Sequence, residues 1–224
     1  KGLGAGTADT GLMVLIAVKP QVFEAVGAEL ASLLSSTGQR EGGEPLVVSI
    51  MAGTLAGTIR ERLGGAVRVV RAMPNTPARI GQGVTGIAAG PGATERDMAA
   101  AERLFRACGP VVVRIDEGLM DAFTAVAGSG PAYLFYLAEA MERAAVGVGF
   151  DGATARAIVG QTVRGAAALL EAGADPAALR AAVTSKGGTT AAATGSLDRD
   201  GVAEAVGRAI EAARDRGREL AGGG

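Results

Sequence analysis

The chain has 224 residues, of which 48% are hydrophobic, and a formal net charge of −1. This balanced charge gives no indication of a nucleic-acid or membrane-surface partner. The single cysteine excludes an intrachain disulfide, and the absence of histidine excludes a Ser-His-Asp triad and the common histidine zinc sites. Any chemistry must therefore use hydroxyls, carboxylates, backbone dipoles or a cofactor, with no metal site expected.

The first half of the chain predicts strands and helices in alternation. Leu12 to Val18 is a continuous apolar run, typical of a strand buried on both faces of a parallel sheet. A helical pattern follows from Val22 to Leu34. Further strands are predicted over 46–50, 67–71, 86–89 and 111–115, and further helices over 54–63 and 94–108, the latter with a capping box at Thr94 and Asp97. This alternation predicts a doubly wound, Rossmann-like α/β domain over residues 1–115.

After residue 115 the predicted strands stop, so we expect an all-helical domain over residues 116–224. Asp151 and Asp175 are candidate N-caps, and Pro176 suits the first position of a helix. The predicted helices cover 118–127, 131–147, 153–171, 176–183 and 202–220, and an Ala-rich helical stretch follows Thr190. The helix over 131–138 is apolar on every face, which predicts a homodimer with Leu134 and Phe135 near its core.

The only Gly-rich segment near the start of the chain, Gly2 to Gly6, does not fit a dinucleotide-binding turn. It lacks the final glycine of GxGxxG, and no strand precedes it. We therefore expect residues 1–11 to be irregular, and we expect the chain to lack an N-terminal βαβ unit of roughly 60 residues. A chain without that unit is expected to bind a dinucleotide weakly.

Three loops follow consecutive predicted strands at their carboxyl ends, where ligands bind in open α/β sheets. They are Ala17-Val18-Lys19-Pro20-Gln21, Ser49-Ile50-Met51-Ala52-Gly53 and Met73-Pro74-Asn75-Thr76-Pro77. Each could be an ordinary loop, and Lys19 could lie on the rim of the sheet. Their recurrence at three strand ends favours a binding edge.

The segment from Thr184 to Thr190 combines four hydroxyl side chains with a Gly-Gly pair. Backbone amides at such a bend, just before a helix, favour a negative group, and the hydroxyls can donate further hydrogen bonds. This pattern predicts an uncharged cradle for one small carboxylate or phosphate. An ordinary Ser/Thr/Gly loop between helices is the alternative.

Taken together, these motifs resemble the pyrroline-5-carboxylate reductase family, the last enzyme of proline biosynthesis. The resemblance covers nearly the whole chain, and the family's N-terminal Gly-rich phosphate loop is the main departure. It rests on AVKP at 17–20, AMPNTP at 72–77, DAFT at 121–124, GSGPAY at 128–133, TSKGGTT at 184–190 and REL at 218–220.

The resemblance implies a reduction of 1-pyrroline-5-carboxylate to L-proline by NADPH or NADH. It implies that Ser185, Gly188, Thr189 and Thr190 hold the substrate carboxylate, with the Thr190 hydroxyl near the ring nitrogen as the catalytic group. It also implies a homodimer, within a larger ring in some members, whose active sites draw on both subunits. The implied cofactor-binding residues are Ala17, Val18, Lys19, Pro20, Ile50, Met51, Ala52 and Glu117.

Several alternatives stay open at this point. Another dehydrogenase of the β-hydroxyacid type usually needs a lysine on the first helix of its helical domain, and residues 118–147 contain none. A non-catalytic dimeric binding protein that has lost its cofactor half is also possible. Glu117 could simply open a helix. The sequence does not decide whether NADPH or NADH is the preferred cofactor. It also leaves open whether Thr190 or water donates the proton. The single cysteine and the absence of a visible secretory signal predict a cytoplasmic location.

Overall fold

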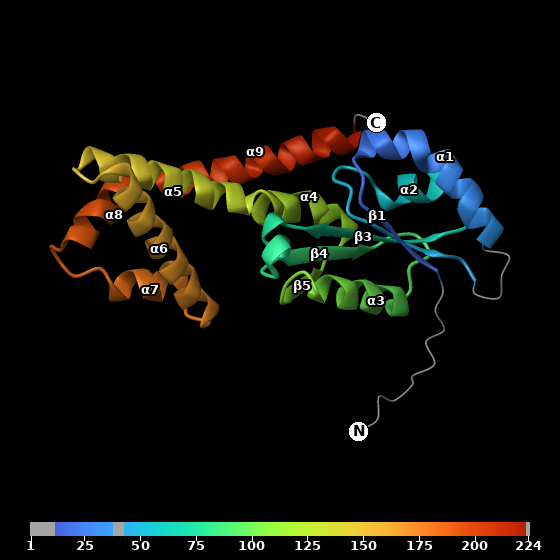
Figure 1. The fold of residues 1–224 in the computed structure, drawn as a ribbon, viewed down its shortest axis with the longest axis horizontal. Coiled ribbons are helices and arrows are strands. Elements are labelled where there is room, and N and C mark those ends of the chain that lie inside the picture. Colours follow the sequence, from blue (N-terminus) through green and yellow to red (C-terminus); the bar gives the residue numbers. More distant parts are fainter. Residues whose placement is uncertain (1–11, 38–42, 223–224) are drawn as a thin grey trace, which may run out of the picture. The chain divides into compact units, whose positions relative to one another are not determined.

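The computed structural model describes residues 12–37 and 43–222, so the segment from Gly2 to Gly6 lies outside it. The chain divides into two compact units (Figure 1): one extends to Ser129 and includes the chain from Glu211 onward, and the other is Gly130–Ile210. This division differs from the predicted one at residues 115 and 116, because the helical turns after Asp116 and the end of the last helix join the sheet unit. A functional boundary near residue 116 stays a prediction.

Five strands form one sheet in chain order, as the α/β prediction required. β1 pairs with β2, β2 with β3 and β4 with β5 in parallel, as the predicted parallel sheet has it, and β3 and β4 form the one antiparallel pair of the described sheet. The strands are β1 (Met13–Ile16), β2 (Leu46–Ser49), β3 (Arg68–Pro74), β4 (Val84–Ala89) and β5 (Val111–Arg114).

The antiparallel pair follows from the short connection between β3 and β4. A parallel pair needs a crossover of about a dozen residues or more, whereas only residues 75–83 lie between these strands, including the 3-10 helix η1 (Thr76–Ile80). The turn is closed by Asn75, whose side-chain Oδ1 accepts a hydrogen bond from the Val84 N–H at 3.0 Å.

Helices cover both faces of the sheet (Figure 1). On one face, α1 (Pro20–Thr37) and α2 (Ala56–Arg62) bury Phe23 and Ile59 against alternate residues of β2 and β3. On the other face, α3 (Glu95–Arg106) buries Met98 and Phe105 against the intervening strand residues. β2 and β3 are covered on both sides, which agrees with their apolar residues at most positions.

β1 is an edge strand of the described sheet and is less buried than the sequence predicts. Ile16 packs with Phe23 in the core under α1, but Leu12 and Leu15 are exposed. The prediction of burial on both faces is therefore wrong for this strand in the isolated chain. The physical reason is that α3 packs against β3, β4 and β5, and no described helix extends that cover to β1.

The predicted helix caps are confirmed. The Thr94 side chain accepts a hydrogen bond from the Asp97 N–H, and the Asp97 carboxylate accepts one from the Thr94 N–H in return. Asp151 accepts hydrogen bonds from two backbone N–H groups of the helix that it precedes, and Asp175 accepts one from Ala178. Pro176 occupies the first turn of its helix, as predicted. These local signals are readable because both partners lie within one turn.

The predicted helix over 118–127 consists of three short segments. They are the 3-10 helix η2 (Glu117–Leu119), α4 (Met120–Phe123) and the π-helix η3 (Thr124–Gly128). The Ser129 N–H donates to the Thr124 carbonyl at 2.8 Å, which is the wide spacing of a π turn. The Asn75 side chain donates to the Ala127 carbonyl at 3.1 Å, so the β3–β4 turn and the π-helix are tied together.

The second unit is entirely helical. Among its described residues only Ala155 and Val159 are buried, although many of its side chains are apolar. No helix in the described part of the chain is both long enough and apolar enough to cross a membrane. Its helices are α5 (Gly130–Gly147), α6 (Gly152–Glu171), α7 (Pro176–Ala182), α8 (Thr189–Arg199) and the first part of α9 (Val202–Gly222).

Candidate active site

Two of the predicted cofactor loops lie at the same edge of the sheet. Ile16 and Ser49 are register partners at the ends of β1 and β2, so the residues after each strand leave the sheet side by side. The Ile50 N–H donates to the Ile16 carbonyl at 3.0 Å and extends the pairing by one residue. The structure thus brings together Ala17, Val18, Lys19, Pro20, Ile50, Met51 and Ala52.

These two loops differ in how firmly they are held. Met51 is buried, and its N–H donates to the Ser49 hydroxyl oxygen at 3.2 Å. Lys19 is exposed, while its carbonyl accepts hydrogen bonds from the N–H groups of Val22 and Phe23 and so opens α1. At this end of the sheet the backbone of both loops is held by hydrogen bonds, while the side chains after β1 are exposed. Such an arrangement suits an extended ligand.

Glu117 reaches the same edge from far along the chain. Its Oε1 accepts a hydrogen bond from the Ala56 N–H at 2.7 Å and another from Arg71 Nη1 at 3.1 Å. Glu117 opens η2, as the alternative interpretation proposed, but its carboxylate binds the first N–H of α2 and a side chain of β3 as well. Its side chain is 28% exposed, so ligand access remains.

Arg71 was not identified as a residue of this site from the sequence alone. It is 3% exposed and lies in β3, between apolar residues that fill both faces of the sheet. The signal was present, because Arg71 follows Val69 and Val70 and precedes Ala72 in a predicted strand, and an arginine buried there requires a partner. The sequence did not reveal that partner, which lies 46 positions away.

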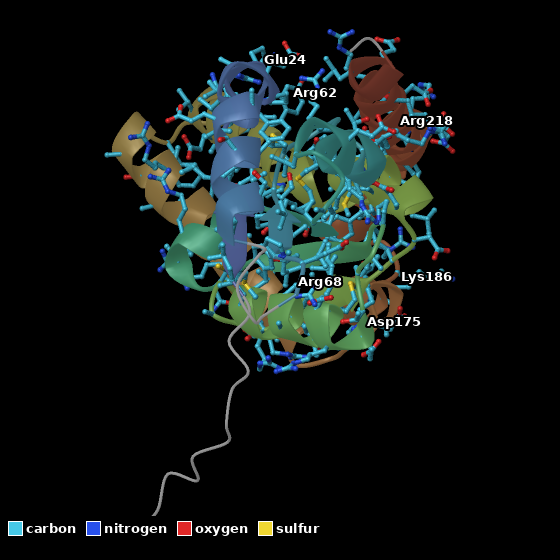
Figure 2. The ribbon with its side chains drawn as sticks, turned by 90° about the vertical axis from the view of Figure 1, so that its right-hand side faces the viewer. Glu24, Arg62, Arg68, Asp175, Lys186 and Arg218 are labelled. Carbon is cyan, nitrogen blue, oxygen red and sulfur yellow. The ribbon has the colours of Figure 1, made fainter. Side chains whose placement is uncertain are left out.

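A pocket of about 280 Å³ adjoins the two loops within the sheet unit. Glu24 of α1 and Arg62 of α2 form an ion pair at 3.2 Å beside it, and Figure 2 shows these two side chains close together. Its lining includes Pro20, Ala52, Gly53 and Thr54 from the loops, and Leu220 from the end of α9. The pocket thus continues the binding edge into the groove between α1 and α2.

The predicted carboxylate loop belongs to the helical unit and forms a tight turn. The Gly188 N–H donates to the Ser185 carbonyl at 3.0 Å, and Gly187 between them has φ 74°, a conformation that glycine adopts without strain. Gly188 is the N-cap of α8 and supplies no capping side chain. The free N–H groups of the first turn of α8 can therefore donate to an anion.

The hydroxyls of this loop are available for a ligand. Within the described residues, the side chains of Ser185, Thr189 and Thr190 make no hydrogen bond, whereas the Thr184 hydroxyl donates to the Arg180 carbonyl at 2.6 Å. Lys186 is exposed at the tip of the turn (Figure 2). The loop thus offers uncharged donors at one helix start. The site roles of these residues remain predictions, because they lie in a different unit from the cofactor loops.

No group of three or more metal-binding side chains occurs among residues 12–37 and 43–222. What the described site offers is a set of hydrogen-bond donors and one carboxylate. Such a set can bind and orient small molecules, and it requires a bound cofactor for redox chemistry.

Comparison with known proteins adds independent evidence. Residues 117–220 match the protein family described as pyrroline-5-carboxylate reductase dimerisation. The chain is 38% identical to the pyrroline-5-carboxylate reductase of Mycobacterium tuberculosis over 96% of its own length and 79% of the relative's.

Two solved structures have the same fold. The pyrroline-5-carboxylate reductase of Coxiella burnetii superposes with a TM-score of 0.83 at 38% identity, covering 97% of this chain and 77% of that one. The pyrroline carboxylate reductase of Plasmodium falciparum, solved with NADP bound, gives a TM-score of 0.81 at 28% identity, covering 93% and 77%. With these matches along nearly its whole length, the chain belongs to the pyrroline-5-carboxylate reductase family.

Proposed function

We propose that this protein reduces 1-pyrroline-5-carboxylate to L-proline with a hydride from NADPH or NADH. The observation that carries the proposal is the loop from Ser185 to Thr190, whose three hydroxyls and first-turn amides are free for one carboxylate, in a chain of this family. The structure of the Plasmodium falciparum relative with NADP supports a nicotinamide dinucleotide as the cofactor.

The residues at the sheet edge fit the nicotinamide and ribose end of such a cofactor. That end carries hydroxyl and amide groups, and the edge offers the exposed residues 17–19 after β1, Ala52 after β2 and the Glu117 carboxylate. The bound cofactor supplies the hydride that the side chains cannot supply. The predicted cofactor-binding residues would hold it so that the reactive face meets the imine.

The reaction balances without an enzymic nucleophile. A C–H bond forms at the imine carbon, the C=N π bond breaks, and the ring nitrogen carries a proton in the product, while the dinucleotide is oxidised. Ser185, Gly188, Thr189 and Thr190 would bind the substrate carboxylate through uncharged donors. A cation in their place would oppose the protonated imine, which is the more electrophilic form. An uncharged clamp therefore holds the anion without lowering reactivity.

The helical unit supports self-association, as its family description indicates. We propose a homodimer built on the helices after residue 116 that assembles further into a larger ring. On α5, Leu134 and Phe135 are exposed in the isolated chain, and we place them near the dimer core. A cytoplasmic location remains a prediction that cell fractionation would test.

The catalytic role of Thr190 can be tested by two substitutions. Thr190→Ala removes the hydroxyl that we place beside the ring nitrogen, and we expect kcat for proline formation to fall by roughly 10²–10³-fold, the effect of losing one transition-state hydrogen bond. Thr190→Ser keeps the hydroxyl and should lose much less. If the alanine variant turned over like the wild type, the loop would be structural and this assignment would fail.

A further inference from the structure

We infer that Arg71 is a positioning residue that holds one oxygen of Glu117, so that the other oxygen can accept a hydrogen bond from the cofactor. The inference rests on the proposed function and deepens it. The group that the free oxygen would bind is an uncharged donor, a hydroxyl or amide at the nicotinamide end. Arg71 would act through Glu117 without touching the ligand.

The two oxygens of Glu117 have different surroundings. Both protein donors, the Ala56 N–H and Arg71 Nη1, bind Oε1, and Oε2 has no hydrogen-bond partner among the described residues. Two donors from different elements fix the position of the carboxylate more closely than either could alone. The arrangement leaves one acceptor oxygen in a fixed place at the edge of the sheet.

Burial makes the arginine and the glutamate depend on each other. Arg71 lies almost fully inside the sheet unit, and a buried cation is costly unless it is paired and hydrogen-bonded. The first N–H of α2 also needs an acceptor, since Leu55 provides no capping side chain. One carboxylate oxygen serves both needs. Without Arg71, a partly exposed glutamate side chain would be held by a single backbone N–H.

The charge of Glu117 limits what its free oxygen can bind. An ionised carboxylate accepts hydrogen bonds and repels anions, so a phosphate group is disfavoured at this position. A nicotinamide dinucleotide carries uncharged donors on both halves, namely its ribose hydroxyls, the carboxamide and the adenine amino group. The proposed function puts the nicotinamide end at this edge of the sheet, so the donors that we assign to the free oxygen are the carboxamide and the hydroxyls of that end.

Substitutions at two positions distinguish the role of Arg71, which holds Oε1, from the role of the free oxygen Oε2 of Glu117. Glu117→Gln keeps one oxygen for Ala56 and Arg71 but replaces Oε2 with an NH₂ group, which donates and cannot accept. Arg71→Met keeps the length of the side chain and removes the anchor, and Arg71→Lys restores a cation with a single donating group. The measurements are the NADPH dissociation constant by fluorescence titration, the KM for NADPH and for the imine, and binding of adenosine 2′,5′-bisphosphate.

We expect Glu117→Gln and Arg71→Met each to weaken NADPH binding by about tenfold or more, the effect of losing one hydrogen bond to a charged group. The affinity for adenosine 2′,5′-bisphosphate and the KM for the imine should stay within about twofold, since neither substitution changes a group that we assign to those ligands. Arg71→Lys should recover part of the loss. The double variant should bind NADPH about as tightly as whichever single variant binds it less tightly, because both substitutions break the same interaction.

Unchanged NADPH binding in folded Glu117→Gln and Arg71→Lys proteins would overturn the inference, even if Arg71→Met did not fold. An equal loss for NADPH, the imine and the bisphosphate would also overturn it, since it would show a structural role. The proposed reaction fails separately. If the wild type bound NADPH and the variants weakened it as expected, but no protein formed proline, the positioning role would stand and the reaction would not.

Discussion

The sheet unit and the helical unit differ in where their apolar side chains lie. In the sheet unit, three clusters of buried residues fill both faces of the sheet. In the helical unit only Ala155 and Val159 are buried, and α5 exposes Leu134, Phe135, Tyr136 and Leu137 in succession. The first unit has a hydrophobic core of its own. The second unit buries almost no side chains and exposes apolar residues of the kind that form a core.

This difference in packing suits the roles that we propose for the two units. A unit with its own core can hold backbone groups and the Arg71–Glu117 pair in fixed positions for a cofactor. We propose that a unit without one gains its stability from a second copy, so that the position of the loop over 185–190, which we propose binds the substrate, depends on association. The predictions below test whether the two units differ in this way.

The largest effect is expected from placing a charge on the exposed face of α5. Phe135 is 68% exposed in the isolated chain, and Phe135→Lys would bury two cations at a symmetric interface. We expect the dimer dissociation constant to rise by about 10³-fold or more, which sedimentation equilibrium would measure. Leu104→Lys on α3 is the matched control in the sheet unit and should leave the dimer unchanged. If both variants dimerised as strongly as each other, α5 would not form part of the dimer interface.

A second test truncates one apolar side chain in each unit. Ile59 of α2 is fully buried against the sheet, so Ile59→Ala should lower the free energy of unfolding by about 2–5 kcal/mol at any protein concentration. Leu134→Ala should cause a loss that is largest where the wild type is dimeric and that shrinks as the protein is diluted below the dimer dissociation constant, because the contact exists only in the dimer. Chemical denaturation at two protein concentrations measures both. A concentration-independent loss for Leu134→Ala would show that the helical unit has its own core.

A smaller effect is expected at the N-terminus of α3. The Thr94 side chain accepts a hydrogen bond from the Asp97 N–H, and Thr94→Ala should lower the free energy of unfolding by about 1 kcal/mol. Thr94→Ser keeps the acceptor and should be nearly neutral. Because this cap lies in the sheet unit, the loss should not depend on protein concentration. Thermal unfolding of the three proteins would test it, and equal losses for Ala and Ser would contradict the capping role.

The smallest effect is a pH dependence in the helical unit. Hydrogen bonds from the Thr154 hydroxyl, and then from the backbone N–H groups of Thr154 and Ala153, lower the pKa of Asp151. A lowered pKa in the folded state stabilises the protein above the ordinary pKa of aspartate and ceases to do so as the pH falls through the folded value. Wild type should therefore lose its advantage over Asp151→Asn below about pH 4. A constant difference between pH 3 and pH 7 would contradict this.

The sequence predicted features whose partners lie close together along the chain. Thr94 with Asp97, and Asp151 with the N–H groups after it, are one turn apart, so spacing alone identifies them. The antiparallel pairing of β3 with β4 was not predicted, although the short connection between these strands leaves no room for a crossover helix. The bonds from Arg71 to Glu117 and from Asn75 to Ala127 join distant residues, and only the fold brings them together.

The candidate site likewise contains features that the sequence predicts and contacts between distant residues that it does not. The loops after β1 and β2 were predicted from their place at strand ends, which the parallel register confirms. The reason that Glu117 is fixed at this edge could not be read from the sequence, because it depends on an arginine in a buried strand and on the first N–H of α2.

The most direct test is to measure the specific activity of proline formation from 1-pyrroline-5-carboxylate and NADPH across a dilution series that spans dimer dissociation. The account predicts one proline for each NADPH oxidised, and a specific activity that falls in parallel with the dimer fraction, because the substrate loop lies in a unit that needs a second copy. Absence of proline at every concentration would contradict it. So would a specific activity that stays constant while the protein becomes monomeric.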